Sequence, residues 1–405
     1  MKRAVLLAIL AAVACLSSCN NYNNNLNFDQ NGNPIPAPPG GNRNSKHPIS
    51  TLNLRAFVTD QFNSAVRILD AKYDGNYGAF INTNPGPSLL QITPDKKLGI
   101  VFETGTNTFQ GIDLAGEATT GSVTLPSWTE DFIIAPDNDT IYAAVRNAPV
   151  TSGVTGTVPG AVEVVGLTAA AITHSVFIPK AHWLALSHNG SKLLVFSDDS
   201  DSVTVVNTSD LTTTTVGGFD RPVWGVFSSD DSTAYILNCG AECGGTQASV
   251  TALNMSNNTP GASAVVEGAT MALLDGGNLY VAGTGVGGGK LDIVSVPAMT
   301  VSKSGVSITD GYHWRMLLTN GQLFVGARNC SNTANGCLAI YNTGSGNSIL
   351  AAAPGDVTGL EAIPNRTVVY VVQGGELVIY DTTTDLPQKT QIDIVGKAYD
   401  VRYVE

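Results

Sequence analysis

The sequence predicts an all-β protein built as a single β-propeller, and three observations lead to this prediction. The first is an internal repeat of about 44 residues that covers most of the chain after residue 53. The second is the composition: 43 glycines and only 13% charged residues favour short strands and turns over helices. The third is an apolar run at the C-terminus, AYDVRYVE, which has no partner strand after it.

The N-terminal segment MKRAVLLAILAAVACLSSC has the features of a bacterial export signal. Lys2 and Arg3 begin it, and the apolar stretch that follows is shorter than the roughly 20 residues that span a bilayer. The tetrapeptide LSSC that ends at Cys19 resembles a lipobox, in which the cysteine becomes the first mature residue and is acylated. We therefore expect residues 1–18 to be a lipoprotein signal peptide and Cys19 to anchor the chain to a lipid membrane.

Residues 19–53 are expected to be the lipidated cysteine and a tether, because they are rich in Asn, Pro and Gly and offer almost nothing to bury. Asn20 follows the cysteine, where Asp is the known signal for retention in the inner membrane. The expected location is therefore the cell envelope, at the outer membrane, facing either the periplasm or the cell exterior. The propeller domain is predicted to occupy residues 54–405.

Each repeat consists of an apolar run, a polar turn, a second apolar run, a loop, a third run and a fourth run rich in Thr and Val. Two clear copies are LLQITPDKKLGIVFETGTNTFQGIDL and LALSHNGSKLLVFSDDSDSVTVVNTSD, and a third is LEAIPNRTVVYVVQGGELVIYDTTTD. These copies resemble the YVTN-type repeat of lactonase-like propellers, and the resemblance implies four-stranded antiparallel blades. A lone blade has two apolar faces, so blades are stable only when they pack side by side in a ring.

The second strands of the repeats predict eight blades. They are expected near Ala56, Gly99, Ile141, Leu193, Ala234, Leu279, Leu323 and Val368. The first unit lacks an inner strand, so Val401–Val404 is expected to supply it and to close the ring. Seven blades is the alternative, because lactonase-like relatives commonly have seven and the units around 141 and 279 are the weakest.

Four cysteines remain in the predicted domain, as the closely spaced pairs Cys239 with Cys243 and Cys330 with Cys337. An exported protein meets an oxidising compartment, so we expect two local disulfides. A metal site is the competing interpretation, but neither pair has CxxC spacing or a histidine beside it. No metal and no cofactor is therefore predicted.

Aligning the repeats places three tryptophans at one equivalent position near the start of the inner strand. The side chains expected around the channel at this face are Trp183, Trp224, Trp314, His182, His313, Arg221 and Arg315. They form a candidate ligand-binding site of aromatic rings and polar groups. The alternative is structural, with the tryptophans packed between adjacent blades and the histidines at the rim.

The sequence excludes some functions and leaves two open. A net charge of −12 argues against nucleic acid, whose phosphates need Lys and Arg. The sequence contains no GxSxG or HExxH motif, and no nucleotide-binding pattern stands in a strand or helix context that would support it. The first hypothesis is a membrane-anchored binding or scaffolding module for an envelope protein or glycan. The alternative is a lactonase-like or other hydrolytic enzyme, whose groups would be drawn from His182, His313, Arg221, Arg315 and Glu361.

Overall fold

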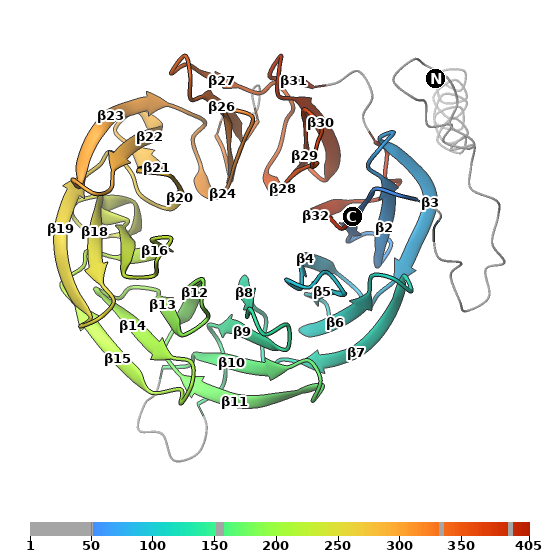
Figure 1. Cartoon of the computed structure of the whole chain (residues 1–405), viewed down its shortest axis with the longest axis horizontal. Helices are drawn as coiled ribbons and strands as arrows, with labels where there is room; N and C mark the ends of the chain where they lie inside the picture. Colours follow the sequence, from blue (N-terminus) through green and yellow to red (C-terminus); the bar gives the residue numbers. More distant parts are fainter. Residues whose placement is uncertain (1–49, 51, 151–157, 332–335, 388–391) are drawn as a thin grey trace, which may run out of the picture.

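In a computed structural model, which describes residues 50, 52–150, 158–331, 336–387 and 392–405, the chain forms a ring of β-sheets (Figure 1). The predicted signal peptide, Cys19 and nearly all of the predicted tether lie outside the described residues. Within the described residues, the strands form eight four-stranded sheets, which confirms the prediction of eight blades over seven. No helix in this part of the chain is long and apolar enough to span a membrane.

In each of the first four blades, the innermost strand lies at the channel and the other three follow it outward. Blade 1 contains β32 (Ala398–Tyr403), β1 (Arg55–Asp60), β2 (Ala65–Asp70) and β3 (Gly75–Asn82). Blade 2 contains β4 (Pro87–Ile92), β5 (Leu98–Glu103), β6 (Thr108–Asp113) and β7 (Ala118–Thr124). Blade 3 contains β8 (Asp131–Ile134), β9 (Thr140–Val145), β10 (Ala161–Gly166) and β11 (Ala171–Phe177). Blade 4 contains β12 (Ala181–Leu186), β13 (Lys192–Ser197), β14 (Ser202–Asn207) and β15 (Thr213–Gly217).

The last four blades have the same order of strands from the channel outward. Blade 5 contains β16 (Pro222–Phe227), β17 (Thr233–Asn238), β18 (Ser249–Asn254) and β19 (Thr259–Val265), with the short 3₁₀ helix η1 (Gly240–Cys243) after β17. Blade 6 contains β20 (Met271–Asp275), β21 (Asn278–Gly285), β22 (Gly288–Ser295) and β23 (Thr300–Ser307). Blade 7 contains β24 (Tyr312–Thr319), β25 (Gln322–Arg328), β26 (Leu338–Asn342) and β27 (Ser348–Leu350). Blade 8 contains β28 (Val357–Ala362), β29 (Val368–Gln373), β30 (Glu376–Asp381) and β31 (Leu386–Pro387).

Burial follows the position of a strand within its blade. Second strands such as β1 (RAFVTD) and β29 (VVYVVQ) are buried along their whole length, because neighbouring blades cover both faces. Outer strands such as β7 (ATTGSVT) and β15 (TTTVG) are mostly exposed and rich in Thr. The apolar second run of each repeat therefore forms a buried strand, and the Thr-rich fourth run forms the exposed strand at the rim.

The polar turn between the inner and second strands has a common backbone feature. In each of blades 2 to 8 it contains a residue with positive φ, a conformation that Gly, Asn and Asp adopt more readily than other residues. These residues are Lys96, Asn138, Gly190, Asp231, Gly276, Asn320 and Asn365. The recurring Asp, Asn and Gly of the repeat are thus explained by the shape of this turn.

The C-terminal strand β32 closes the ring, as predicted. It pairs antiparallel with β1, with Val401 opposite Val58 and Tyr403 opposite Ala56. Figure 1 shows β32 lying between the blade-8 strands and β4, next to the marked C-terminus. Val401 is fully buried in an apolar cluster that also contains side chains of blade 8. Ring closure therefore depends on strand pairing and apolar packing between the two ends of the chain.

Shortening Val401 to Ala should lower the free energy of unfolding by about 2–3 kcal/mol, because the lost methyl groups leave a cavity at the closure. Denaturant unfolding of the protein would measure this change in the free energy of unfolding. Val265→Ala is the matched control, since Val265 is 62% exposed on β19 and its truncation should cost less than about 0.5 kcal/mol. Equal effects of the two substitutions would contradict a closure that depends on β32.

Candidate functional site

One end of the central channel brings together residues from several blades. The inner strands β8, β12, β16 and β24 begin at this end, and the loops that follow the second strands β9, β13, β17 and β25 emerge beside them. We call this end the mouth of the channel. The three equivalent tryptophans lie at the mouth, each as the third residue of its inner strand.

The rings at the mouth contact one another across the channel. Trp183 of blade 4 packs edge-on against Trp224 of blade 5, with ring centres 5.9 Å apart. Trp183 also stacks with Tyr312 of blade 7, which is not an adjacent blade, at 6.4 Å. Trp314 and Tyr399 belong to the same apolar cluster. These five residues are called the aromatic plug, and their contacts reach across the channel from blade 4 to blade 7.

The plug changes how the tryptophans are interpreted. Trp183 and Trp314 are buried, with 5% and 4% of their surface exposed. Trp314 also donates a hydrogen bond from its indole nitrogen to the backbone oxygen of Val357 in blade 8, at 2.8 Å. The packing alternative therefore describes their surroundings better than an open aromatic platform, although the contacts run across the channel as well as between adjacent blades.

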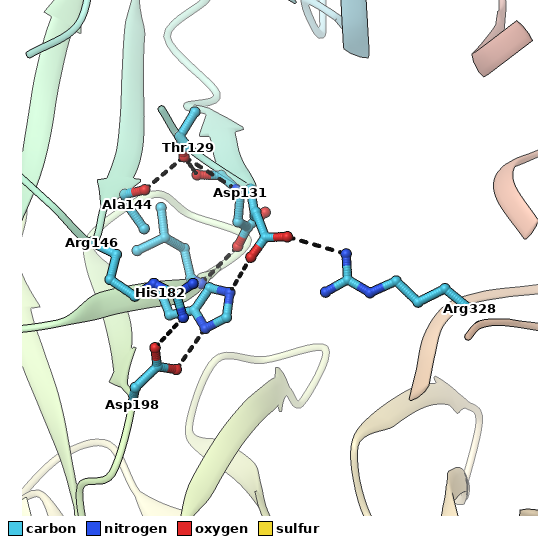
Figure 2. A network of polar contacts seen from close by, with 9 residues as sticks. Thr129, Asp131, Ala144, Arg146, His182, Asp198 and Arg328 are labelled. Atoms are coloured by element: carbon cyan, nitrogen blue, oxygen red, sulfur yellow. Dashed lines mark hydrogen bonds and ion pairs between the residues drawn. The ribbon is translucent and has the colours of Figure 1, made fainter. Parts of the chain in front are cut away.

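A polar network borders the plug (Figure 2). The His182 ring lies between two carboxylates, with Nε2 at 2.7 Å from Glu130 and Nδ1 at 2.6 Å from Asp198. Arg328 donates to the second oxygen of Glu130 at 3.1 Å, and Arg146 pairs with the second oxygen of Asp198. We call these five residues the mouth network.

The mouth network also crosses the channel. Glu130 directly precedes β8 in blade 3, whereas Arg328 ends β25 in blade 7, so the two residues come from opposite sides of an eight-bladed ring. Figure 2 shows the Arg328 side chain extending from its own blade toward the His182 side of the channel. This ion pair joins residues 198 positions apart in sequence and connects the two halves of the mouth.

The protonation states of the mouth network follow from its contacts. The hydrogen bond from His182 and the charge of Arg328 lower the pKa of Glu130 to about 2. Burial would raise the pKa of Asp198, but hydrogen bonds from His182 and Arg146 outweigh it and lower that pKa to about 2. Burial would likewise lower the pKa of His182, yet Asp198 and Glu130 raise it above its ordinary value. His182 is therefore held as an imidazolium that donates from both nitrogens.

Two buried aspartates connect neighbouring blades near the axis. Asp131 accepts a hydrogen bond from the backbone N–H of Leu184 in the next blade, at 2.7 Å, and burial raises its pKa to about 7. Asp400 of β32 accepts from the backbone N–H of Leu90 in blade 2, at 3.0 Å. These carboxylates hold inner strands in position, so their burial has a structural explanation.

A cavity of about 330 Å³ opens at the mouth and is called the mouth pocket. Three arginines line it, Arg146, Arg221 and Arg328, together with His182. Trp183, Pro222 and Val223 are among the apolar residues of its wall. Two carboxylates, Asp198 and Asp199, also line it, so the mouth pocket combines cationic groups from blades 3, 4, 5 and 7 with two acidic side chains of blade 4 and a partly apolar wall.

The structure brings only some of the predicted site residues to this pocket. Trp183, His182 and Arg221 line it, whereas Trp224 and Trp314 lie in the plug. His313 is fully buried rather than at the rim, with Nε2 bonded to the backbone oxygen of Thr309 at 2.8 Å, and burial lowers its pKa to about 4. Arg315 donates to the backbone oxygen of Thr358 at 3.0 Å and lies over the Trp314 ring.

Both predicted disulfides are present, and both lie at the mouth. Cys239–Cys243 encloses η1, and Cys243 contributes to the wall of the mouth pocket. Cys330–Cys337 staples the loop that follows Arg328. The first of these short crosslinks restricts a loop that forms part of the pocket wall, and the second begins two residues after Arg328. Among the described residues, no group of three or more His, Cys, Asp or Glu side chains is placed to hold a metal ion.

The sequence reasoning missed Glu130, Arg146 and Arg328. One signal was present for the arginines. An Arg-Asn dipeptide stands at the end of the second strand in two repeats, at Arg146 after β9 and at Arg328 in β25. Equivalent positions in two blades both point to the mouth, so this dipeptide could have indicated a pair of cations there.

Comparisons with known proteins identify the fold. No protein-family model matches the chain, and no curated protein matches it in sequence. Dihydro-heme d1 dehydrogenase NirN, solved in complex with DHE, is similar in structure, with a TM-score of 0.65 and 12% identity over 90% of this chain and 77% of that chain. Apo AztD from Citrobacter koseri has a TM-score of 0.55 and 12% identity, covering 86% and 97% of the two chains.

A third similar structure is a protein of unknown function from Desulfotomaculum acetoxidans DSM 771, with a TM-score of 0.52 and 13% identity. It matches 86% of this chain and 98% of its own. At these identities the likeness concerns the fold alone. The chain is a β-propeller whose overall shape is shared with other solved propellers, while its mouth must be interpreted from its own residues.

The charge on His182 should make part of the stability pH-dependent. Because its pKa is raised in the folded state, the imidazolium stabilises the fold below the unfolded value of 6.5, and this contribution is lost as the pH rises through the folded pKa. The difference in unfolding free energy between wild type and His182→Gln should therefore be larger near pH 6 than near pH 9. Denaturant titrations across this range would measure it.

The matched control is His188→Gln. His188 also contacts a carboxylate, Asp231, but it is 60% exposed at a surface turn, so its pair should contribute little. A His182→Gln difference that stays constant with pH, or that grows as the pH rises, would show that the mouth network does not hold a charged imidazole.

Proposed function

We propose that this propeller is a membrane-tethered binding module that docks an envelope protein on the mouth of its channel. The observation that supports the proposal is the mouth pocket, a cavity of about 330 Å³ that contains cationic side chains from four blades, borders the plug and includes one of the disulfide loops in its wall. A site that is ordered before a ligand arrives loses little conformational freedom on binding.

The geometry favours binding over catalysis. A general base or a base-activated nucleophile needs a nitrogen or oxygen that is available to the substrate. Both nitrogens of His182 are bonded to carboxylates, and His313 is buried against Thr309. Glu361 does not line the mouth pocket, and burial raises its pKa to about 7. Of the five groups named for a hydrolytic site, only His182 and Arg221 line the mouth pocket, and both His182 nitrogens are already bonded.

The choice between a protein and a glycan partner follows from the aromatic rings. Glycan sites commonly offer an exposed aromatic face, but here Tyr312 is stacked by Trp183 and covered by the Arg328 guanidinium at 5.2 Å. Trp183 is in turn stacked by the His182 ring, with centres 4.5 Å apart. With these faces occupied, the mouth offers charges and hydrogen-bond donors, which suit a protein surface better than a sugar ring.

The tether belongs to the same proposal. A lipidated Cys19 followed by residues 20–53 would hold the domain near a membrane while leaving the mouth able to meet its partner. The first strand begins at Arg55, so the proposed anchor is separate from the fold. The YVTN-type resemblance supports the blade pattern and adds no further feature to this function.

Crosslinking in intact cells, followed by purification of the protein, would test the docking surface. Val223→Trp should fill the mouth pocket and remove at least one protein that the wild type captures. Val265→Trp, on the exposed outer strand β19, is the matched control and should capture the same proteins as the wild type. Identical capture by both variants would show that the mouth is not the docking surface.

The anchor is tested with Cys19→Ala in the same cells. This variant should move from the membrane fraction to the soluble fraction and keep the melting temperature of the wild type, because the anchor lies outside the propeller. Retention of Cys19→Ala in the membrane fraction would contradict lipid anchoring and leave the docking proposal to be judged on the pocket variants.

A further inference from the structure

The arginines of the mouth pocket carry more hydrogen-bond donors than their observed partners use. Each arginine carries five N–H donors. Among the described residues, the Arg328 side chain donates only to Glu130 and the Arg146 side chain pairs only with Asp198. The Arg221 side chain makes no hydrogen bond within this part of the chain, and its nearest carboxylate, Asp201, lies at 3.7 Å.

Most of the carboxylate oxygens at the mouth already accept from side chains of the protein. Both carboxylate oxygens of Glu130 accept from Arg328 and His182, and both oxygens of Asp198 accept from His182 and Arg146. Asp199 is paired with Lys180 at 2.6 Å. The donors that remain have no acceptor among the described residues and are available to a ligand, and a carboxylate is the planar acceptor that fits a guanidinium best.

We propose that the mouth pocket recognises the carboxylate of an acidic side chain in the partner protein, an inference that rests on the docking function above. Arg221 and Arg328 donate to the carboxylate from blades 5 and 7, and Arg146 adds charge from blade 3. Pro222 and Val223 lie beside Arg221 and accommodate the methylene groups of a Glu side chain. The partner segment is acidic and extended enough to insert one side chain.

The charge of the whole protein makes this recognition local. A chain with a net charge of −12 repels acidic peptides in general, so long-range attraction cannot explain their binding. An acidic segment binds only where cations are concentrated, and the mouth pocket is such a place. Binding should weaken as salt is added, because the pocket is open to solvent and its charges are screened.

The test is isothermal titration of the intact propeller with a short peptide that alternates Glu with Gly. The peptide should bind, and the same peptide with Gln in place of Glu should not. Arg221→Gln should weaken binding by about tenfold, the effect of losing one charge-assisted hydrogen bond. Arg221→Lys should lie between the wild type and Arg221→Gln, because it keeps the charge and loses the planar donor pair.

Lys97→Gln is the matched control. It removes the same charge from a residue that is 79% exposed in the turn between β4 and β5, at the far end of the blades, and it should bind the Glu peptide as the wild type does. Arg221→Gln should also keep the wild-type melting temperature, since its side chain makes no hydrogen bond within the described fold.

Three outcomes would overturn the inference. The Glu peptide could fail to bind, Arg221→Gln and Lys97→Gln could bind it equally, or oligogalacturonate could bind more tightly than the peptide, which would make the source of the carboxylate a glycan. If the Glu peptide does not bind while Val223→Trp still fails to capture a protein that the wild type captures in cells, only the recognition of an acidic side chain is wrong. If Val223→Trp captures the same proteins as the wild type, the docking function itself is wrong.

Discussion

The interaction on which the mouth of this propeller depends is the contact of aromatic side chains across the central channel that eight blades enclose. Rings from several blades pack together at one end of this channel, including Trp183 and Tyr312, which stack although their blades are not adjacent. This contact between non-adjacent blades, together with the Glu130–Arg328 pair from opposite blades, connects the inner strands across the channel. The mouth network packs on this plug, with His182 stacked on Trp183 and Arg328 over Tyr312. Residues of both the network and the plug line the mouth pocket.

The mouth network explains why charged groups can stay so close to an apolar plug. A lone buried charge is costly, but each charge here is paired and hydrogen-bonded. Glu130 and Asp198 share His182 between them, and an arginine completes each carboxylate. Arg146 and Arg328 keep N–H donors that these pairs do not use. The pairing that stabilises the mouth therefore also holds both guanidinium groups at the mouth pocket, where a ligand can contact them.

Much of the fold could be predicted from the sequence, because the repeat records local structure. All eight predicted second strands are observed, from Ala56 in β1 to Val368 in β29, and the unpaired C-terminal run does close the ring. Both cysteine pairs are crosslinked, since partners so near in sequence need little tertiary information. The repeat also placed the three tryptophans at one position of the inner strand, at one end of the channel.

The site was only partly predictable, for a physical reason. Aligning repeats gives the height of a residue along the channel, but it does not show which side chains meet across the axis. Arg328 and Glu130 are far apart in sequence and in ring order, and His313 and His182 occupy similar positions with different surroundings.

A double-mutant cycle on Glu130→Gln and Arg328→Gln, measured as free energies of unfolding, tests the cross-channel contact most directly. The expected result is a coupling free energy of about 1 kcal/mol that decreases with added salt. Effects that add to within about 0.3 kcal/mol would contradict a stabilising contact between Glu130 and Arg328 across the channel.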